Sequence, residues 1–367
     1  MTTVLFSHEA FSNQAVGGVS RCMVELMRGL ETTGVDWRVW AGKHGNRYLH
    51  EDRGLDHRVV CGTYGPLMGR VRDALTQERP FARYAARNRP QVVHRTYYPI
   101  IDLLPTATPR IVTMHDMHNE LYDERDRPIE RLRSLVKRRS LERADAIVCI
   151  SQSTLNLMTE MWPHLAARSC VIPHGVRRLS DMPVPSATEQ PFFVFVGGRA
   201  GQKNFAMALK ALAASILEDH HLVCVGGGAL SDGERQMVSE YGLLNRVRQV
   251  AASDDELAGL YQSAAAFLYP TRSEGFGMPI LEAMIHNCPV VTTALTSLPE
   301  VGGDAVLYAD PDDTDAWRSA IESLVIDSVL RSKMVRRGQL QALNFTWEEN
   351  AQRHLNVYRQ FASSATS

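Results

Sequence analysis

Residues 266–287 read AFLYPTRSEGFGMPILEAMIHN, and they place a strand, a turn and a helix in one short segment. The apolar run Ala266 to Tyr269 is typical of a buried strand. Pro279 suits the first turn of a helix, because its missing N–H is not needed there. Gly275 and Gly277 allow a sharp turn that exposes backbone N–H groups. A strand–turn–helix unit of this kind indicates an α/β fold.

The same alternation of short apolar runs and amphipathic helices continues on both sides of this segment. Before residue 178 we expect strands at Val4 to Ser7, Trp37 to Trp40, Val92 to His94, Arg110 to Met114, Ala146 to Ile150 and Cys170 to Ile172, and helices at Ser20 to Leu30, Ala82 to Asn88 and Glu130 to Glu142. After it we expect strands at Phe192 to Val196, Leu222 to Val225, Val247 to Val250, Ala266 to Tyr269 and Val290 to Thr292, separated by helices that include one at Pro279 to Asn287. This order predicts two doubly wound domains, each with a parallel sheet covered by helices.

The expected domain boundaries follow from a change in composition. Residues 178–191 are rich in Pro and Ser and carry no periodicity, so we interpret them as a linker between a domain at 1–177 and one at 192–345. Residues 346–367 are expected to form a last helix. Doubly wound sheets bind ligands outside the carboxyl ends of their strands, so the cleft between the domains is the expected site.

The composition is that of an ordinary globular protein, with 44% hydrophobic and 22% charged residues and a formal net charge of -1. The six cysteines are dispersed without a Cys-x-x-Cys pair, and several lie in apolar runs, which is typical of reduced, buried thiols. No apolar run reaches the ~18 residues of a membrane span, and Met1 to Ser7 does not resemble a signal peptide. We therefore expect a cytoplasmic protein, and the near-neutral charge disfavours a nucleic-acid partner.

Two carboxylates frame the glycine turn of the opening segment. Glu274 stands at the mouth of the strand and Glu282 about one turn into the helix, so both could hold hydroxyl groups at two ends of one ligand. The alternative is a surface glutamate and a helix glutamate that share only a connecting turn. The sequence Gly-Phe-Gly-x-Pro between them favours the functional interpretation.

A second candidate segment runs from Phe193 to Asn204, FVFVGGRAGQKN, where a buried strand leads into a glycine-rich turn. Arg199 can bind phosphate oxygens with two parallel hydrogen bonds, and Lys203 supplies a compact positive charge. Together they could bind a diphosphate and stabilise it as it leaves. Solvated charges at the start of a helix are the alternative. A P-loop is excluded, because Ser or Thr should follow the lysine and Asn204 does.

Three further turns carry weaker signals. Gly17 and Gly18 lie between the first strand and the first helix, in a phosphate-type turn. Gly226 to Gly228 also follow a strand, but Ser231 stands where a dinucleotide motif needs its third glycine, so no nicotinamide cofactor is expected. His115-Asp116-x-His118 could contribute to a metal site, but the sequence identifies no distant ligand that would complete it. We interpret His115 as a polar contact at the carboxyl end of its strand.

These segments together resemble the family 4 retaining glycosyltransferases, which have the GT-B architecture of two Rossmann-like domains facing across a cleft. The resemblance spans nearly the whole chain. It rests on Gly17-Gly18-Val19, Thr113-Met114-His115-Asp116, Ile150-Ser151-Gln152-Ser153, Ile172-Pro173-His174-Gly175-Val176, Gly198-Arg199 with Lys203-Asn204, Glu274 to Glu282, and Tyr308-Ala309-Asp310-Pro311.

The resemblance implies a role for each matching residue of the carboxyl half. Arg199 and Lys203 match the pair that binds the donor diphosphate, Glu274 the carboxylate beside the donor sugar, and Glu282 the one that holds the ribose. Backbone N–H groups for the sugar would come from Gly275, Phe276 and Gly277. Ala200-Gly201-Gln202 depart from the usual residues of the Arg–Lys loop, which puts the contacts of that loop in doubt.

In the amino half, the resemblance implies that Gly17 and Gly18 approach the phosphate and that His115 contacts the donor sugar near the reaction centre. The expected catalytic residues are His115, Glu274, Arg199 and Lys203. The amino domain would bind the acceptor and the carboxyl domain the nucleotide sugar, and the last helix would return to the amino domain. The acceptor would attack from the face that the diphosphate leaves, with retention of configuration and without a metal ion or a cofactor.

The stretch Thr113-Met114-His115-Asp116-Met117, together with the amino half as a whole, resembles bacterial mannosyltransferases of surface polysaccharide assembly. GDP-mannose is therefore the favoured donor, followed by UDP-glucose or a dTDP-sugar, and a glycan or lipid-linked glycan is the expected acceptor. The basic stretches Arg127 to Arg143 and Arg70 to Arg89 could contact anionic lipid at the inner face of the cytoplasmic membrane, or could be solvated helix faces. A nucleotide-sugar epimerase or phosphorylase, and a non-catalytic scaffold with a donor-like pocket, are the alternative functions.

Overall fold

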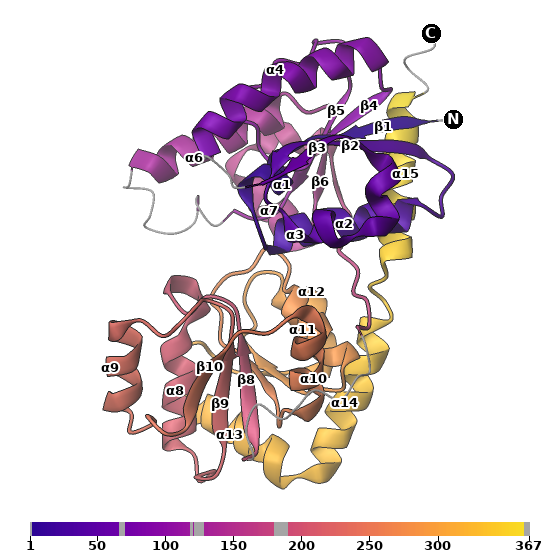
Figure 1. The fold of residues 1–367 in the computed structure, drawn as a ribbon. Helices are drawn as coiled ribbons and strands as arrows, with labels where there is room; N and C mark the ends of the chain where they lie inside the picture. Colours follow the sequence, from indigo (N-terminus) through magenta and orange to yellow (C-terminus); the bar gives the residue numbers. More distant parts are fainter. Residues whose placement is uncertain (1, 66–69, 118–119, 121–127, 180–189, 363–367) are drawn as a thin grey trace. The chain divides into compact units, whose positions relative to one another are not determined.

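The computed structural model describes residues 2–65, 70–117, 120, 128–179 and 190–362, and the side chains of residues 70–75 are not described. It divides into two compact units. The first unit combines residues 1–175 with residues 347–367, and the second unit comprises residues 176–346. Each unit is built around one parallel sheet of Rossmann-like type (Figure 1).

The sheet of the first unit has seven parallel strands in the order β3-β2-β1-β4-β5-β6-β7. The strands are β1 Thr3–Phe6, β2 Asp36–His44, β3 Val59–Tyr64, β4 Val92–Arg95, β5 Arg110–Met114, β6 Ala146–Cys149 and β7 Ser169–Val171. The central strands β4, β5 and β6 are buried along their whole length. This agrees with a sheet covered on both faces.

Helices cover this sheet and connect its strands. They are α1 Glu9–Asn13, α2 Gly18–Leu30, α3 Arg47–Glu51, α4 Arg70–Asn88, α6 Pro128–Glu142, α7 Gln152–Met161 and α15 Trp347–Ala362. The C-terminal helix α15 belongs to this unit and packs against α2, as the yellow helix beside α2 in Figure 1 shows. Its buried Tyr358 donates or accepts a hydrogen bond of 2.7 Å at His94 of β4.

The sheet of the second unit has six parallel strands in the order β10-β9-β8-β11-β12-β13. These strands are β8 Phe192–Val196, β9 His221–Val225, β10 Val247–Val250, β11 Phe267–Tyr269, β12 Val290–Thr292 and β13 Leu307–Tyr308. The helices are α8 Phe205–Ala214, α9 Asp232–Glu240, α10 Asp254–Ser263, α11 Met278–Ile285, α12 Leu298–Gly302, α13 Thr314–Ile326 and α14 Ser328–Ala342. The two sheets confirm the predicted fold class.

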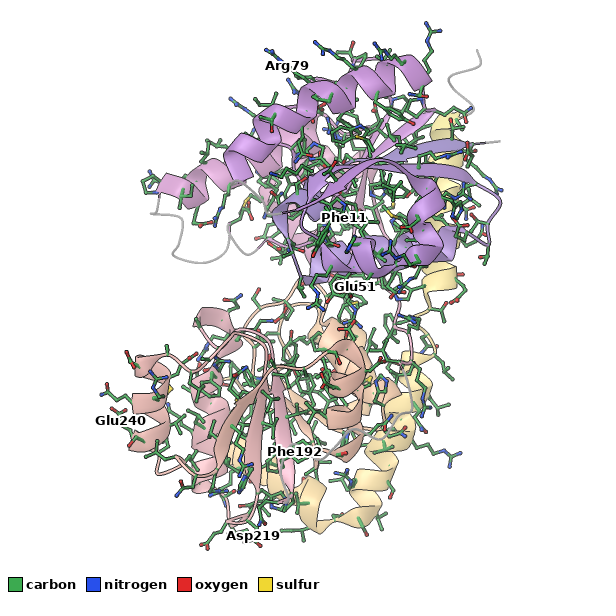
Figure 2. All side chains as sticks on the ribbon, viewed as in Figure 1. Phe11, Glu51, Arg79, Phe192, Asp219 and Glu240 are labelled. Carbon is green, nitrogen blue, oxygen red and sulfur yellow. The ribbon has the colours of Figure 1, made fainter. Side chains whose placement is uncertain are left out.

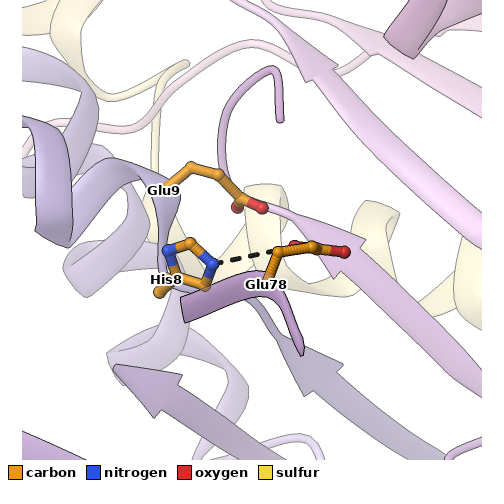
Figure 3. Close-up of side chains that lie close together, drawn as sticks. All are labelled: His8, Glu9 and Glu78. Carbon is orange, nitrogen blue, oxygen red and sulfur yellow. Dashed lines mark ion pairs between the residues drawn. The ribbon is translucent and has the colours of Figure 1, made fainter. Parts of the chain in front are cut away.

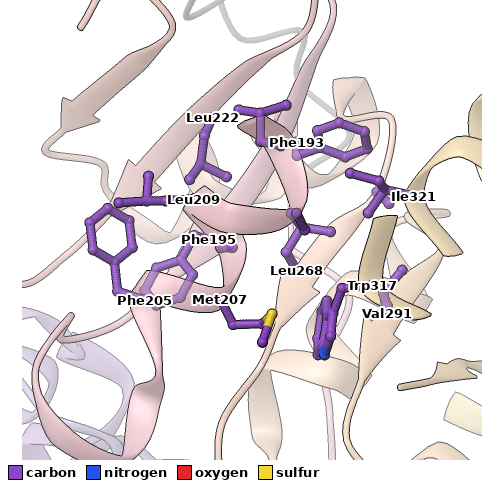
Figure 4. Packing of buried hydrophobic residues seen from close by; sticks show 14 of the residues in the cluster. Phe193, Phe195, Phe205, Met207, Leu209, Leu222, Leu268, Val291, Trp317 and Ile321 are labelled. Atoms are coloured by element: carbon purple, nitrogen blue, oxygen red, sulfur yellow. The ribbon is translucent and has the colours of Figure 1, made fainter. Parts of the chain in front are cut away.

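A single apolar cluster fills one face of the second sheet. Phe193 and Phe195 of β8 pack with Phe205 of α8 and Trp317 of α13, and all four are buried (Figure 4). The Phe195 and Phe205 rings meet edge to face with their centroids 5.3 Å apart. In both units, apolar side chains lie inside and charged ones outside. The labelled Phe11 and Phe192 are buried, whereas Glu51, Arg79, Asp219 and Glu240 are exposed (Figure 2).

The largest difference from the expected elements is α4, which begins at Arg70 instead of Ala82 and contains Pro80. A proline inside a helix costs about 3 kcal/mol or more, which is why the sequence predicts a helix only after it. The helix continues because residues before Pro80 are anchored in the core. Gln77 donates to and accepts from the backbone of Lys43, and Glu78 binds Arg95.

Several short elements were absent from the sequence-based assignment, namely α1, α3, β3, α7, α12 and β13. The helix α7 carries a readable signal, because Ser151 accepts a hydrogen bond from the Thr154 N–H as an N-cap. The linker assigned to residues 178–191 lies mostly outside the described residues. None of the six cysteines forms a disulfide, and Cys61 is exposed, contrary to the expectation of buried thiols. Among the described helices, none is long and apolar enough to cross a bilayer.

Candidate functional site

The turn between β11 and α11 is fastened by side chains from the start of α12. Gly277 has a φ of 108°, in the left-handed region that favours glycine, and Pro279 lies in the first turn of α11. The buried Ser297 hydroxyl lies 3.0 Å from the Glu274 carbonyl and 2.8 Å from the Phe276 carbonyl. The Glu274 N–H donates to Thr296 Oγ1 at 3.1 Å. These bonds fix the backbone that presents Glu274.

Lys203 and Glu274 form an ion pair with one another, although the sequence predicts that they hold two different parts of a ligand. Lys203 Nζ lies 2.5 Å from Glu274 Oε1 and 3.1 Å from the Tyr269 hydroxyl, and 5.1 Å above the centre of the Tyr269 ring. Thr271 donates a second hydrogen bond to Glu274 Oε1 at 2.9 Å. The Lys203 and Glu274 side chains are 21% and 17% exposed, so a ligand can still reach the pair.

Tyr269 links this pair to the second carboxylate. Burial raises the pKa of the Tyr269 hydroxyl well above its usual range, and the charges of Glu274 and Glu282 add to the effect. The phenol therefore remains neutral near pH 7. Glu282 is a buried residue of the helix α11 that follows the turn. The structure thus brings Lys203 and Glu274 together on one tyrosine that the sequence does not mark, whereas the contact of Glu282 with a ribose stays a prediction.

Arg199 is buried and binds the backbone of a neighbouring glycine turn. Its side chain is 1% exposed and pairs with Glu234, with Nε 2.9 Å from Glu234 Oε1. Its other nitrogens donate to the carbonyl oxygens of the following glycine turn: Nη1 to Gly226 at 2.7 Å, and Nη2 to Gly228 at 2.8 Å, Ala229 at 3.1 Å and Gly227 at 3.3 Å. Its contact with a diphosphate stays a prediction, because these donors are already engaged.

The same contacts explain Gly226 to Gly228, which the sequence suggested and then excluded as a dinucleotide motif. All three have positive φ, at 84°, 70° and 72°, so their carbonyl oxygens turn toward the guanidinium. A Cβ at Gly227 would lie 2.8 Å from Arg199 Nη1. Glu234, which completes the pairing, forms a capping box with Ser231. The Ser-x-x-Glu spacing is a sequence signal for that cap.

The glycine turn of the first unit leads directly into α2. Gly17 is the residue before the helix and Gly18 is its first residue. A Cβ at Gly18 would meet no atom within 4 Å, whereas one at Gly17 would lie 2.4 Å from Gln14 Oε1. Gln14 Oε1 accepts a hydrogen bond from the Ser20 N–H at 3.1 Å, so one helix N-terminal donor is already capped. The predicted approach of Gly17 and Gly18 to a phosphate stays a prediction.

His115 follows β5 and is buried at its carboxyl end. Its backbone N–H donates to the Tyr98 hydroxyl at 3.1 Å, and its ring lies near Tyr97 and His174, with centroids 5.9 Å and 6.3 Å away. Burial lowers the pKa of His115 to about 4, so the imidazole is neutral at pH 7. Its Nε2 has no hydrogen-bond partner among the residues that the structure describes.

The metal interpretation of His115-Asp116-x-His118 includes His118, which lies outside the described residues. Asp116 instead faces Lys137 of α6, with Oδ1 3.6 Å from Nζ. Within the described part of the chain, the group with metal-ligand spacing is a different one, His8, Glu9 and Glu78 (Figure 3). His8 and Glu9 follow β1 after Ser7, a position at the carboxyl end of a strand that could have marked them in the sequence.

Two family models match consecutive parts of this chain. The model described as Glycosyltransferase Family 4 matches residues 16–178, and the model described as Glycosyl transferases group 1 matches residues 178–341. O-antigen chain mannosyltransferase B of Escherichia coli is 46% identical over 106 residues, which cover 29% of this chain and 28% of that protein. O-antigen chain mannosyltransferase RfbU of Salmonella typhimurium is 27% identical over 222 residues, 60% of this chain and 62% of that protein. Each match thus spans less than two thirds of the relative's length.

Solved structures resemble the chain over nearly its full length. Sucrose-phosphate synthase from Thermosynechococcus elongatus has a TM-score of 0.78 at 20% identity, covering 99% of this chain and 100% of that one. HepE from Anabaena, solved with UDP and glucose, has a TM-score of 0.72 at 16% identity and covers 98% of this chain and 100% of that one. These likenesses show the fold, two Rossmann-like units of the GT-B class.

Proposed function

Because this chain belongs to the glycosyltransferases in which a family 4 domain is followed by a group 1 domain, we propose that it transfers a mannosyl group from GDP-mannose to a glycan or lipid-linked acceptor of a bacterial surface polysaccharide. The observation that carries this proposal is the Lys203–Glu274 pair on Tyr269, which offers a cation and a carboxylate at the end of a parallel sheet. Two relatives, both O-antigen chain mannosyltransferases, support mannose as the sugar.

Lys203 would neutralise the negative charge that develops on the departing diphosphate. Such preorganised groups typically contribute about 10²–10³-fold to turnover. Glu274 would accept hydrogen bonds from hydroxyl groups of the sugar, and Glu282 from those of the ribose. Donor binding then replaces the direct Lys203–Glu274 contact with contacts to the ligand, so the carboxylate is a positioning group.

The reaction proposed is a retaining one that needs no metal ion. The acceptor oxygen forms its bond to the anomeric carbon on the face where the bond to the diphosphate breaks, and the acceptor proton passes to the leaving phosphate oxygen. Lys203 supports metal independence, because it provides positive charge beside the predicted phosphate position. With methyl α-mannoside as the acceptor, the new glycosidic bond should be α-configured by NMR. Addition of EDTA should leave the rate of transfer unchanged.

The primary test is donor binding. Purified protein is titrated with GDP-mannose, UDP-glucose and a dTDP-sugar, and its melting temperature is recorded for the wild type, Lys203→Ala and the matched variant Lys210→Ala, a lysine exposed on α8. We expect GDP-mannose to stabilise the wild type and Lys210→Ala most, and Lys203→Ala least. Stabilisation by none of these nucleotide sugars would favour the scaffold interpretation. Conversion of the sugar without an acceptor, with the nucleotide still attached, would favour an epimerase.

We further propose that α6 contacts anionic lipid. Ile129, Leu132 and Leu135 lie three residues apart on this helix and are 53%, 55% and 51% exposed, while Arg131 and Arg139 are exposed on the same helix. Apolar side chains between basic ones match a bilayer surface with negative headgroups. Not every basic residue of the predicted stretch is available to lipid. Lys137 is buried, with its Nζ 2.7 Å from Glu120 Oε2, and Arg127 lies outside the described residues.

This membrane contact predicts co-flotation with vesicles. Wild-type protein should float with vesicles that contain phosphatidylglycerol and remain in solution with phosphatidylcholine alone. Leu132→Ser combined with Leu135→Ser should abolish flotation, and Ile216→Ser, at a 70% exposed position of the second unit, should not. Equal flotation of all variants would place the contact elsewhere.

A further inference from the structure

The lysine of the proposed donor site stands on a short loop whose own hydrogen bonds are weak. Lys203 ends a single 3-10 turn, Gly201–Lys203, which connects β8 to α8. The Lys203 N–H donates to the Ala200 carbonyl at 3.4 Å, and the next N–H donates to Gly201 at 3.2 Å. Both bonds are longer than the common N···O distance of about 2.9–3.0 Å. Contacts with other segments therefore decide where the lysine points.

Asn204 makes the first of these contacts. Its side-chain Nδ2 donates to the Pro311 carbonyl at 2.9 Å, across 107 positions of the chain. An asparagine in the position before a helix usually caps it, because its side chain accepts a hydrogen bond from the first turn. Asn204 holds this position before α8, yet its side chain caps none of the described N–H groups of that helix. The amide thus serves the contact with Pro311 instead of the helix.

Pro311 is a well-anchored partner for this amide. It follows β13 in the segment Tyr308-Ala309-Asp310-Pro311, which matches the family pattern but has no role in the donor site described above. The indole Nε1 of the buried Trp317 donates to the Asp310 carbonyl at 2.9 Å, and the Asp312 N–H donates to Asp310 Oδ1 at 2.9 Å. Trp317 belongs to the apolar cluster of the second unit, so the hydrogen bond of Asn204 ends on a part of the chain that the core holds in place.

A second contact holds the other side of the lysine. The Arg272 N–H donates to the Gln202 carbonyl at 2.7 Å, and the Arg272 guanidinium pairs with Asp312, with Nη1 2.9 Å from Oδ2. Arg272 lies two residues before Glu274, so this link joins the loops of both partners of the ion pair. It uses the backbone of Gln202, so it is independent of the side chains of Ala200-Gly201-Gln202, where the sequence departs from the family pattern.

We infer that Asn204 is a positioning residue for Lys203, which acts through its hydrogen bond to the Pro311 carbonyl. Lysine carries its charge on a flexible stem, and a charge stabilises a leaving group best when it is already in place. The bond of Asn204 fixes the backbone from which the ammonium group reaches Glu274 and Tyr269. The effect on donor binding rests on the function proposed above. The effect on the lysine itself does not, because every contact named lies within the second unit.

A double-mutant cycle tests this inference. Asn204→Gly removes the amide and tolerates the φ of 52° at this position. Calorimetry with GDP compares the wild type, Asn204→Gly, Lys203→Ala and the double variant. We expect Asn204→Gly to weaken GDP binding at least fivefold when Lys203 is present. In the Lys203→Ala background it should weaken GDP binding less than twofold, because the amide acts only through the lysine.

The matched control is Asn287→Gly. Asn287 also has a positive φ, of 65°, and its side chain also forms a hydrogen bond, with Gln339 Nε2 at 2.6 Å. This variant should bind GDP as the wild type does. Circular dichroism checks that both glycine variants are folded at the temperature of the measurements.

Chemical labelling reports on the lysine without any nucleotide. The wild type and both glycine variants are treated with limiting acetic anhydride, and acetylation of Lys203 and Lys210 is followed by mass spectrometry. Lys210 is exposed on α8 and serves as the internal reference. In Asn204→Gly we expect Lys203 to be acetylated at least threefold faster relative to Lys210, because its ammonium group spends less time on Glu274 and Tyr269. Asn287→Gly should leave the ratio unchanged.

The results separate the role of Asn204 from the proposed transfer. Equal losses of GDP affinity in the presence and absence of Lys203, a loss shared by Asn287→Gly, or an unchanged acetylation ratio in Asn204→Gly overturns the inference. If the wild type binds neither GDP nor any nucleotide sugar, the proposed transfer fails. Faster acetylation of Lys203 in Asn204→Gly would then still support its positioning by Asn204.

Discussion

Lys203 Nζ lies 2.5 Å from Glu274 Oε1, so the two charges neutralise one another. The same ammonium group contacts the hydroxyl and the ring of the buried Tyr269. A nucleotide diphosphate must therefore compete with Glu274 for the lysine ammonium. Glu274→Gln should strengthen binding of GDP several-fold, because the competing negative charge is removed, while it lowers sugar transfer. Titration calorimetry with GDP measures the first effect. Weaker GDP binding in this variant would contradict a lysine that serves the diphosphate.

Removing the lysine should have the opposite effect on the nucleotide. Lys203→Ala should weaken GDP binding at least tenfold and reduce turnover by about 10²–10³-fold, as expected for loss of a preorganised charge beside a leaving group. Its melting temperature should fall less than that of Arg199→Ala, because Thr271 still donates a hydrogen bond to Glu274 when the lysine is removed. Lys210→Ala serves as the control. Unchanged GDP affinity would remove Lys203 from the donor site.

Arg199 should matter first for stability. Arg199→Ala leaves Glu234 without its partner and the carbonyls of Gly226 and Gly228 without their donors, so the free energy of unfolding should fall by about 3–5 kcal/mol. Urea unfolding of this variant beside Arg248→Ala, an exposed arginine on β10, measures the difference. A variant as stable as the wild type, with lost GDP binding, would restore the phosphate role predicted from the sequence.

Acid should destabilise the first unit through its buried histidines. Burial lowers the pKa of His94 and His174 well below 6.5, and lowers the pKa of both His115 and His354 to about 4. A group whose pKa is depressed in the folded state stabilises the fold fully above its unfolded pKa of 6.5. This stabilisation is lost as the pH falls from 6.5 toward 4, by about 2 kcal/mol at pH 5 for each of the latter two.

Urea midpoints at pH 7.5, 6 and 5 measure this loss. His354→Gln removes one of the titrating groups, so its midpoint should depend less steeply on pH between 6.5 and 4. The depressed pKa values would be wrong for the folded protein if the wild-type midpoint were the same at pH 7.5 and pH 5.

The sequence predicts the elements best where local and tertiary preferences agree. The run from Ala266 to Asn287 places β11 and α11 within two residues of their observed bounds, because apolar strand, glycine turn and N-terminal proline all act together. It fails at α4, where Pro80 argues for a boundary and buried contacts of Gln77 and Glu78 override it. Those contacts join residues far apart in the chain, so no local pattern reports them.

The candidate site shows the same division. Residue type and turn context single out Arg199, Lys203 and Glu274, but they do not say which way each side chain turns. The pairing of Lys203 with Glu274 spans 71 positions, and the three left-handed glycines that enclose Arg199 begin 27 positions after it. Tyr269 and Ser297 emerge only from the folded structure, since an apolar strand residue and a serine in a polar loop carry no chemical signature in the sequence.

Ser297 should control turnover through the backbone of the Glu274 turn. Its hydroxyl serves the carbonyl oxygens of both Glu274 and Phe276, and Ser297→Ala leaves these buried acceptors without it, at a cost of about 1–3 kcal/mol in the free energy of unfolding. The Lys203 ammonium lies on another segment, so GDP affinity should change less than threefold. Sugar transfer depends on the orientation of Glu274, so kcat should fall at least tenfold. Ser323→Ala on α13, whose hydroxyl bonds only within its own helix, provides the control for loss of a serine hydroxyl. Equal losses of GDP affinity and of kcat in Ser297→Ala would mean that the whole site, and not the carboxylate alone, depends on this hydroxyl.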